Sequence, residues 1–244
     1  MTPGIPRVEL LLTGRPCFAS GRDARSGLMT LADWTAAVDD MTVLGIPEVR
    51  FGGDDPAHSP DLVPLLRHAL RLGLTAEVHT VRANVPPHLW HWLAIDGARL
   101  SLTYYSDDPA EHDGITREPG SHGRALATIV RALDLGVPLR VTLVRTSEEQ
   151  RIAGAVAELT ALGVTDLRVE RPRRASRAAV QRLCSRCYYD HATIDPNGDL
   201  HGCALSRPFP TGNVRFERLA ATVGNYRPAG DSARTTDRTN RAAR

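Results

Sequence analysis

Apolar residues in this chain gather in short runs that alternate with helical patterns, and several of these helical patterns end at a glycine. Four of the endings read Leu44-Gly45-Ile46, Leu72-Gly73-Leu74, Leu135-Gly136-Val137 and Leu162-Gly163-Val164. Glycine suits the left-handed position that closes a helix. A strand-like run follows each ending, and two further runs complete a set of six predicted strands: Val8–Leu12, Glu48–Phe51, Thr75–Thr80, Arg99–Thr103, Leu139–Val144 and Asp166–Glu170.

The repeating unit is one strand followed by one helix. Gly73 lies 28 residues after Gly45, and Gly163 lies 27 residues after Gly136. The 63 residues from Gly73 to Gly136 hold one more unit that lacks the glycine signal. Regular alternation of this kind predicts a parallel sheet with right-handed crossovers.

The helix starts carry matching signals. Thr30 and Ser59 are predicted helix N-caps, with Pro60 at the first helical position. Six strand–helix units are too few for a closed eightfold barrel. We therefore expect the α/β class, with an open partial (β/α)6 barrel that ends near Glu170.

Composition limits the classes of function. The chain has 244 residues, 42% of them hydrophobic, which is enough for a substantial core. A formal charge of +2, from 30 basic and 28 acidic residues, predicts no nucleic-acid partner. No apolar stretch approaches the roughly 18 residues of a membrane span, and the N-terminus lacks the layout of a signal peptide. We expect no membrane partner and a cytoplasmic location.

The four cysteines lie in two places. Cys17 follows the first predicted strand, and the others form the pattern Cys184-x2-Cys187-x10-Gly198-x4-Cys203. Thiolates favour zinc and iron-sulfur clusters, and a C-x2-C pair brings both sulfurs to the same side of one metal centre. We therefore expect a small metal-binding module that starts at Cys184 and extends to about residue 213.

A turn signal explains how the third thiol of this module would return to the pair. Asp195-Pro-Asn-Gly198 predicts a hairpin between residues 192–194 and 199–201, which would bring Cys203 back to the C-x2-C pair. Iron-sulfur and zinc both remain open as the metal. His191, His201, water or a peptide group would then complete the coordination.

Several motifs of the chain occur together in one known family. Cys187-x10-Gly198-x4-Cys203 contains a Pro196-Asn-Gly198 turn, and Gly212-Asn213 follows it. The segment after the fourth predicted strand contains Ser106-Asp-Asp-Pro109, His112-Asp113 and Gly120-Ser-His122. Over roughly residues 5–215, the chain resembles radical SAM enzymes that carry a C-terminal SPASM or twitch extension.

The resemblance implies a domain organisation, cofactors and site residues. Residues 1–172 would form the radical SAM-like barrel and residues 173–222 a SPASM/twitch-like iron-sulfur module, while residues 223–244 are expected to be a disordered, arginine-rich tail. Cys184, Cys187 and Cys203 would hold an auxiliary 4Fe-4S cluster. S-adenosylmethionine would be contacted by Cys17, Gly53, Asp55 and Pro56. The partner would be a ribosomal precursor peptide or a partner maturase.

The chain departs from the family at two motifs. The family has C-x3-C-x2-C after the first strand, whereas only Cys17-Phe-Ala-Ser20 matches it here and about six residues are absent. The family's Gly-Gly-Glu-Pro is replaced by Gly53-Asp54-Asp55-Pro56, so Asp55 carries the carboxylate on a side chain shorter by one methylene. One thiolate does not replace three as a cluster ligand set. We therefore expect weak binding of S-adenosylmethionine and no reductive cleavage of it by this chain alone.

Two function hypotheses stay open. In the first, the chain is a radical SAM/SPASM-type iron-sulfur protein linked to the modification of a ribosomally made peptide. In the second, it is a non-catalytic descendant that binds a peptide or partner enzyme, and its C-terminal cysteines hold zinc or a structural cluster. Cys17 can also be read as a small buried hydrophobic residue, and Asp54 and Asp55 as helix caps.

Overall fold

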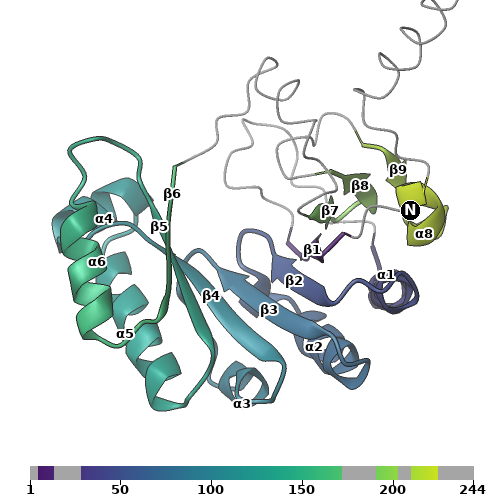
Figure 1. Cartoon of the computed structure of the whole chain (residues 1–244), viewed down its shortest axis with the longest axis horizontal. Coiled ribbons are helices and arrows are strands. Elements are labelled where there is room, and N and C mark those ends of the chain that lie inside the picture. Colours follow the sequence, from purple (N-terminus) through teal and green to yellow (C-terminus); the bar gives the residue numbers. More distant parts are fainter. Residues whose placement is uncertain (1–4, 14–28, 172–190, 203–209, 225–244) are drawn as a thin grey trace, which may run out of the picture.

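A computed structural model of the chain describes residues 5–13, 29–171, 191–202 and 210–224. The described strands form one sheet in the order β6-β5-β4-β3-β2-β1-β7-β8-β9 (Figure 1). They are β1 (Arg7–Leu11), β2 (Glu48–Gly52), β3 (Thr75–Thr80), β4 (Ala98–Tyr104), β5 (Leu139–Val144), β6 (Asp166–Glu170), β7 (Ala192–Ile194), β8 (Asp199–His201) and β9 (Gly212–Asn213). Because β6 and β9 are the two ends of this order, the barrel is open.

Helices lie between the strands along the chain. They are α1 (Leu31–Val43), α2 (Leu62–Arg71), α3 (Leu89–Leu93), α4 (Pro109–Thr116), α5 (Ser121–Asp134), α6 (Ile152–Ala161) and α8 (Leu219–Gly224), with a short 3-10 helix η1 (Pro56–His58). Strands β1 to β6 pair in parallel, each with the next along the chain. The six predicted strands and the partial (β/α)6 barrel are confirmed. None of the described helices is long and apolar enough to cross a membrane.

The helix-end signals in the sequence correspond to observed caps. The four glycines of the Leu-Gly endings have φ values of +68°, +77°, +65° and +95°, as a left-handed closing position requires. At the start of α1, the Asp33 amide donates to Thr30 Oγ1 (3.2 Å), and the Thr30 amide donates to Asp33 Oδ2 (2.8 Å). This capping box confirms the predicted N-cap at Thr30.

The second helix begins later than predicted, although Ser59 Oγ accepts from the Asp61 amide (3.3 Å), as a capping side chain does. Helix α2 begins at Leu62, with Asp61 as its N-cap, and Pro60 lies in the turn before it. Ser59 closes the 3-10 helix η1 through its amide, which donates to the Pro56 carbonyl (3.0 Å). The first helical hydrogen bond between residues four apart runs from the Leu65 amide to the Asp61 carbonyl (3.1 Å). The regular helix therefore starts two residues after Pro60, the predicted first residue.

The two faces of the sheet differ in polarity. On one face, alternate strand residues are fully buried and apolar, as with Val49, Phe51 and Val78, and they belong to the core that also contains residues of α1, α2 and α3. Successive strand residues point to opposite faces. The remaining positions, such as Arg50 and Glu77, therefore point to the concave inner face of the open barrel.

The C-terminal hairpin continues the same sheet. Strand β7 pairs in parallel with β1, and β8 pairs antiparallel with β7, so the predicted hairpin is confirmed. In its turn, Asp195 Oδ1 accepts from the amides of Asn197 (2.8 Å) and Asp199 (3.1 Å), and Gly198 has φ +87°. Beyond the hairpin, the buried Asp40 of α1 binds Arg218 and accepts from the Leu219 amide (2.8 Å), which joins α8 to α1.

Candidate functional site

The carboxyl ends of β1 to β6 lie along one edge of the parallel sheet, where α/β proteins place their ligands (Figure 1). The loop after β2, residues 53–56, lies at this edge beside the end of β1. Gly53 has φ +121°, and a Cβ at this position would lie 2.5 Å from Thr13 Oγ1 and 3.0 Å from the Thr13 backbone nitrogen and oxygen. Only glycine fits this approach of two backbone segments.

Asp55 lies in the same loop with one carboxylate oxygen unused. Its amide donates to Thr13 Oγ1 (3.2 Å), and Oδ2 lies 2.9 Å from His58 Nδ1. The other oxygen, Oδ1, is buried and has no hydrogen-bond partner. Asp55 makes no capping bond to η1, which begins at Pro56. A buried acceptor without a donor is costly, so Oδ1 fits a ligand group that carries N–H donors.

Asp54 has a different environment. Its carboxylate lies 3.8 Å from Arg82, which also pairs with Glu118 (3.0 Å) in the segment between α4 and α5. Arg82 therefore links the loop after β2 to the α4–α5 segment. Half of the Arg82 side chain is exposed, so these contacts contribute little to stability and mainly orient the rim.

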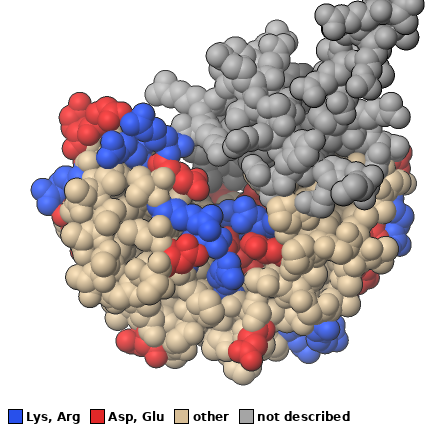
Figure 2. Space-filling model, viewed as in Figure 1, with Lys and Arg blue, Asp and Glu red and all other residues tan. Residues whose placement is uncertain are grey.

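The concave face below this loop carries a row of ion pairs. Glu77, which is fully buried, lies 3.2 Å from Arg50 Nε and 2.7 Å from Arg140 NH1. Arg50 also approaches Glu9 (3.6 Å), and Arg140 pairs with Asp166 (2.8 Å). Figure 2 shows basic and acidic atoms gathered side by side in the middle of this view. Positive and negative groups alternate from β1 to β6. With Arg168, which lies 3.5 Å from Asp166, three guanidinium groups face three carboxylates, so the row carries no net charge.

Sequence reasoning did not identify this row as part of a site. Its signal was present, because the predicted strands place charged residues at every second position, as in Glu48-Val-Arg50 and Asp166-Leu-Arg168. In a strand buried on one face, such alternation places all charges on the other face. The partners of each charge nevertheless depend on strand register.

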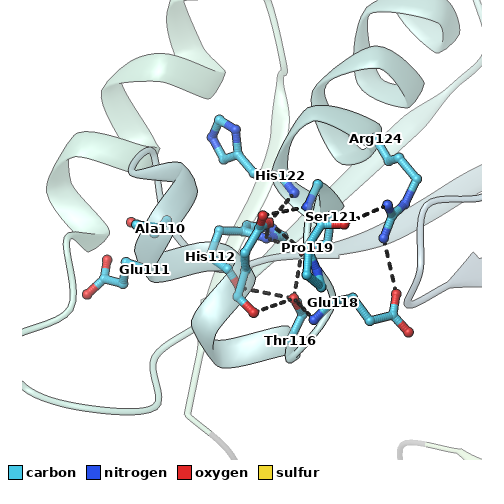
Figure 3. Close-up of polar contacts among 12 residues, drawn as sticks. Ala110, Glu111, His112, Thr116, Glu118, Pro119, Ser121, His122 and Arg124 are labelled. Atoms are coloured by element: carbon cyan, nitrogen blue, oxygen red, sulfur yellow. Dashed lines mark hydrogen bonds and ion pairs between the residues drawn. The ribbon is translucent and has the colours of Figure 1, made fainter.

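The family-like motif after β4 forms two helix starts. Asp108 Oδ1 accepts from the amides of Ala110 (2.7 Å) and Glu111 (3.1 Å), and Pro109 is the first residue of α4. Asp113 Oδ1 accepts from the His122 amide (2.9 Å) and the Ser121 hydroxyl (2.8 Å) at the start of α5. In Figure 3, Ser121 and Thr116 face each other between the two helices.

These amide bonds lower the pKa of Asp113 to about 2, with the backbone bonds from His122 and Gly120 as the main cause. A carboxyl with a lowered pKa stabilises the fold above its ordinary value of 3.8, and this contribution is lost as the pH falls toward 2. We expect Asp113→Asn to lower the Tm at neutral pH and to reduce the loss of Tm between about pH 5 and 2.5. Thermal unfolding followed by circular dichroism measures both.

Asp134→Asn is the matched control for this prediction. Asp113 binds amides at the start of α5, and Asp134 is a carboxylate in the last turn of that helix. A negative charge there opposes the helix dipole, so its removal should not lower the Tm. Equal losses of Tm in the two variants would contradict the capping role of Asp113.

The predicted metal ligands Cys184, Cys187 and Cys203, and also Cys17, lie outside the described residues. The described residues contain no group of three or more His, Asp or Glu side chains that could hold a metal ion. Of the predicted cofactor-binding residues, the structure brings Gly53, Asp55 and Pro56 together at the end of β2, against Thr13 at the end of β1.

Comparison with known proteins shows which enzymes the chain is similar to. It is 31% identical over 132 residues to the PqqA peptide cyclase of Xanthomonas campestris pv. campestris, across 53% of this chain and 35% of the relative. The PqqA peptide cyclase of Rhodopseudomonas palustris is 26% identical over 167 residues, across 65% of this chain and 44% of the relative. The chain is a relative of the radical SAM enzymes. It spans less than half the length of these two curated relatives.

Solved structures agree with this relationship in fold. Streptococcus suis SuiB bound to S-adenosylmethionine aligns with 93% of this chain and with 67% of its own chain, at a TM-score of 0.70 and 15% identity. Native anSMEcpe with bound AdoMet aligns with 92% of this chain and 82% of its own, at a TM-score of 0.68 and 10% identity. No family model matches the sequence. The resemblance to radical SAM enzymes is confirmed.

Proposed function

We propose that this radical SAM relative takes part in the modification of a ribosomally made peptide. In this proposal, the end of β2 binds S-adenosylmethionine, and Cys184, Cys187 and Cys203 hold an auxiliary 4Fe-4S cluster. The observation that carries the proposal is the loop at residues 53–56, where Asp55 keeps a buried, unpartnered carboxylate oxygen beside a glycine that admits no side chain.

The residues of this loop fit the amino acid end of S-adenosylmethionine. The free oxygen of Asp55 is an acceptor for an ammonium group, and the close packing of Gly53 on Thr13 holds the loop at the strand edge. When bound at an iron-sulfur cluster, S-adenosylmethionine supplies radical chemistry that protein side chains do not provide. The role of the chain is to orient this group and to present the peptide to it.

The peptide as partner is supported by the comparisons. The curated relatives are named PqqA peptide cyclase, and the fold aligns with SuiB bound to the precursor peptide SuiA at a TM-score of 0.70. The open barrel adds a polar concave face next to the loop at residues 53–56, which suits an extended, hydrogen-bonding ligand.

The reduced cysteine set limits what the chain does alone. Cys17 is the one cysteine near the end of the first strand, whereas the family motif supplies three. Cluster stability depends on multiple thiolates, so a partner maturase would have to supply ligands for the S-adenosylmethionine-binding cluster. Without that partner, we expect weak binding of S-adenosylmethionine and no 5′-deoxyadenosine.

The test is anaerobic reconstitution with iron and sulfide, followed by metal analysis and an absorption spectrum. We expect about four irons per chain, with the brown charge-transfer band lost in Cys187→Ala and Cys203→Ala and retained in the control Cys17→Ala. A colourless protein with one zinc would contradict the iron assignment and favour the non-catalytic descendant. Formation of 5′-deoxyadenosine by the chain alone after dithionite reduction would contradict the need for a partner.

A further inference from the structure

One polar group on the concave face has no role in the ion pairs described above. His79, on β3, is partly buried, and the one hydrogen bond that its ring makes to a described residue joins Nδ1 to Ser101 Oγ (3.0 Å). Ser101 in turn donates to Glu77 Oε1 (2.9 Å). The second ring nitrogen, Nε2, is therefore available for a ligand.

The hydrogen-bond chain fixes the tautomer of His79. A serine hydroxyl has a single proton, and Ser101 gives it to Glu77, whose negative charge is held by Arg50 and Arg140. Ser101 Oγ must then accept from His79, so the proton of the neutral ring is on Nδ1. Nε2 carries the lone pair and is a hydrogen-bond acceptor.

The surroundings also keep the ring neutral. Burial and the neighbouring Arg50 and Arg7 guanidinium groups hold the pKa of His79 well below its ordinary value of 6.5. A neutral imidazole oriented by a hydroxyl and a carboxylate resembles the arrangement that orients histidine in many binding sites. The ring therefore presents an acceptor at physiological pH.

Strand register places this acceptor next to the candidate site. Phe51 pairs with Val78, so Gly52 lies beside His79, and Ser101 pairs with both His79 and Arg140. Gly52 has no side chain, and a Cβ there would lie 2.7 Å from Glu9 Oε1. The Glu9 side chain therefore lies over Gly52, immediately before the loop that begins at Gly53, and His79 itself keeps part of its surface exposed.

We propose that Nε2 of His79 accepts a hydrogen bond from an uncharged N–H or O–H group of the peptide that enters the barrel. This inference rests on the proposed function and specifies how the chain recognises its substrate. The ion pairs on this face neutralise one another, so an uncharged donor, such as a backbone amide, a side-chain amide or a hydroxyl, fits best there. A carboxylate would meet the lone pair of Nε2 and is disfavoured.

The experiment starts with a displayed library of random peptides, selected on the immobilised wild-type chain. Recovered peptides are retained if they slow the acylation of His79 by diethyl pyrocarbonate, read by mass spectrometry. His91, which is exposed on α3 outside the barrel, is the internal reference. The Kd of each retained peptide is then measured by fluorescence anisotropy for the wild type, His79→Phe, His79→Gln, Ser101→Ala and the double variant His79→Phe/Ser101→Ala.

We expect His79→Phe to weaken binding about tenfold, because the ring is kept but the acceptor is lost. His79→Gln, whose amide oxygen reaches the position of Nε2, should restore most of the affinity. Ser101→Ala should weaken binding about threefold when His79 is present and not at all in the double variant, because it acts only through the tautomer. A purely structural role would not produce this rescue and coupling.

Three outcomes would overturn the inference: equal Kd values in all variants, a His79→Gln variant as weak as His79→Phe, or recovered peptides of which none protects His79. The failure of the proposed function looks different, because in that case the wild-type chain recovers no peptide at all. Unfolding temperatures of the variants show whether a loss of affinity reflects a loss of fold.

Discussion

Replacement of Glu77 by alanine is expected to lower the free energy of unfolding by about 3–5 kcal/mol, because it removes one member of a buried charge cluster. Glu77 is fully buried and lies within 3.2 Å of Arg50 and 2.7 Å of Arg140. Its loss leaves two guanidinium groups, mostly shielded from water, without their common carboxylate. The Ser101 hydroxyl also loses its acceptor. Urea unfolding followed by circular dichroism measures the change.

The matched control is Glu48→Ala on the neighbouring strand. Glu48 pairs with Arg7 at 3.4 Å, and about a quarter of each side chain is exposed, so solvent screens the pair. We expect its loss to cost no more than about 1 kcal/mol. Glu77→Gln should fall between the two alanine variants, because the amide keeps the shape and an acceptor for Ser101. A loss for Glu77→Ala no larger than that for Glu48→Ala would show that the cluster is not an energetic unit.

Replacement of Gly53 by alanine should destabilise the chain by about 3 kcal/mol and abolish any binding of S-adenosylmethionine. The backbone of Gly53 has φ +121°, and the added methyl group would lie 2.5 Å from Thr13 Oγ1. The two segments that form the candidate site would have to separate. Asp55 would then lose its amide bond to Thr13 (3.2 Å) and its fixed position. Urea unfolding and isothermal titration with S-adenosylmethionine measure the two effects.

Gly163→Ala is the control that separates the cost of backbone strain from the cost of the steric contact between residue 53 and Thr13. Gly163 also has a positive φ, +95°, but a Cβ there would meet nothing within 4 Å. It closes α6, far from the loop at residues 53–56 along the sheet order. We expect a loss of about 1 kcal/mol with no effect on ligand binding. If both variants lose the same stability and keep the same affinity, the close approach of Gly53 to Thr13 has no functional role.

The local elements of this protein were predictable because their signals are short in range. A glycine after Leu135 or Leu162 closes a helix whatever packs around it, and Asp195-Pro-Asn-Gly198 turns the chain through bonds among its own residues. The error in the start of the second helix has the opposite origin. The 3-10 turn before this helix depends on how Asp55 and Pro56 follow β2, and the residues at positions 59 and 60 do not indicate that turn.

The candidate site was predictable only in part. The sequence named Gly53, Asp55 and Pro56 through family resemblance, and these residues do lie at a strand end. It did not identify Thr13 as the residue against which Gly53 packs, because the two are 40 positions apart and join only when β1 pairs with β2. The lack of a partner for the buried Asp55 oxygen was likewise not predictable, because burial depends on the tertiary structure and not on the residue type.

The sequence by itself determined the strand–helix repeat, the helix ends, the hairpin and the cysteine spacing that points to a radical SAM relative with a metal-binding module. Only the tertiary structure decided that β7 pairs with β1, that Asp40 holds Arg218 across 178 positions, and that Glu77 lies between two arginines. The physical reason is range. Propensities and turns act over a few residues, whereas the partner of a buried charge is set by strand register and by the shape of the whole sheet.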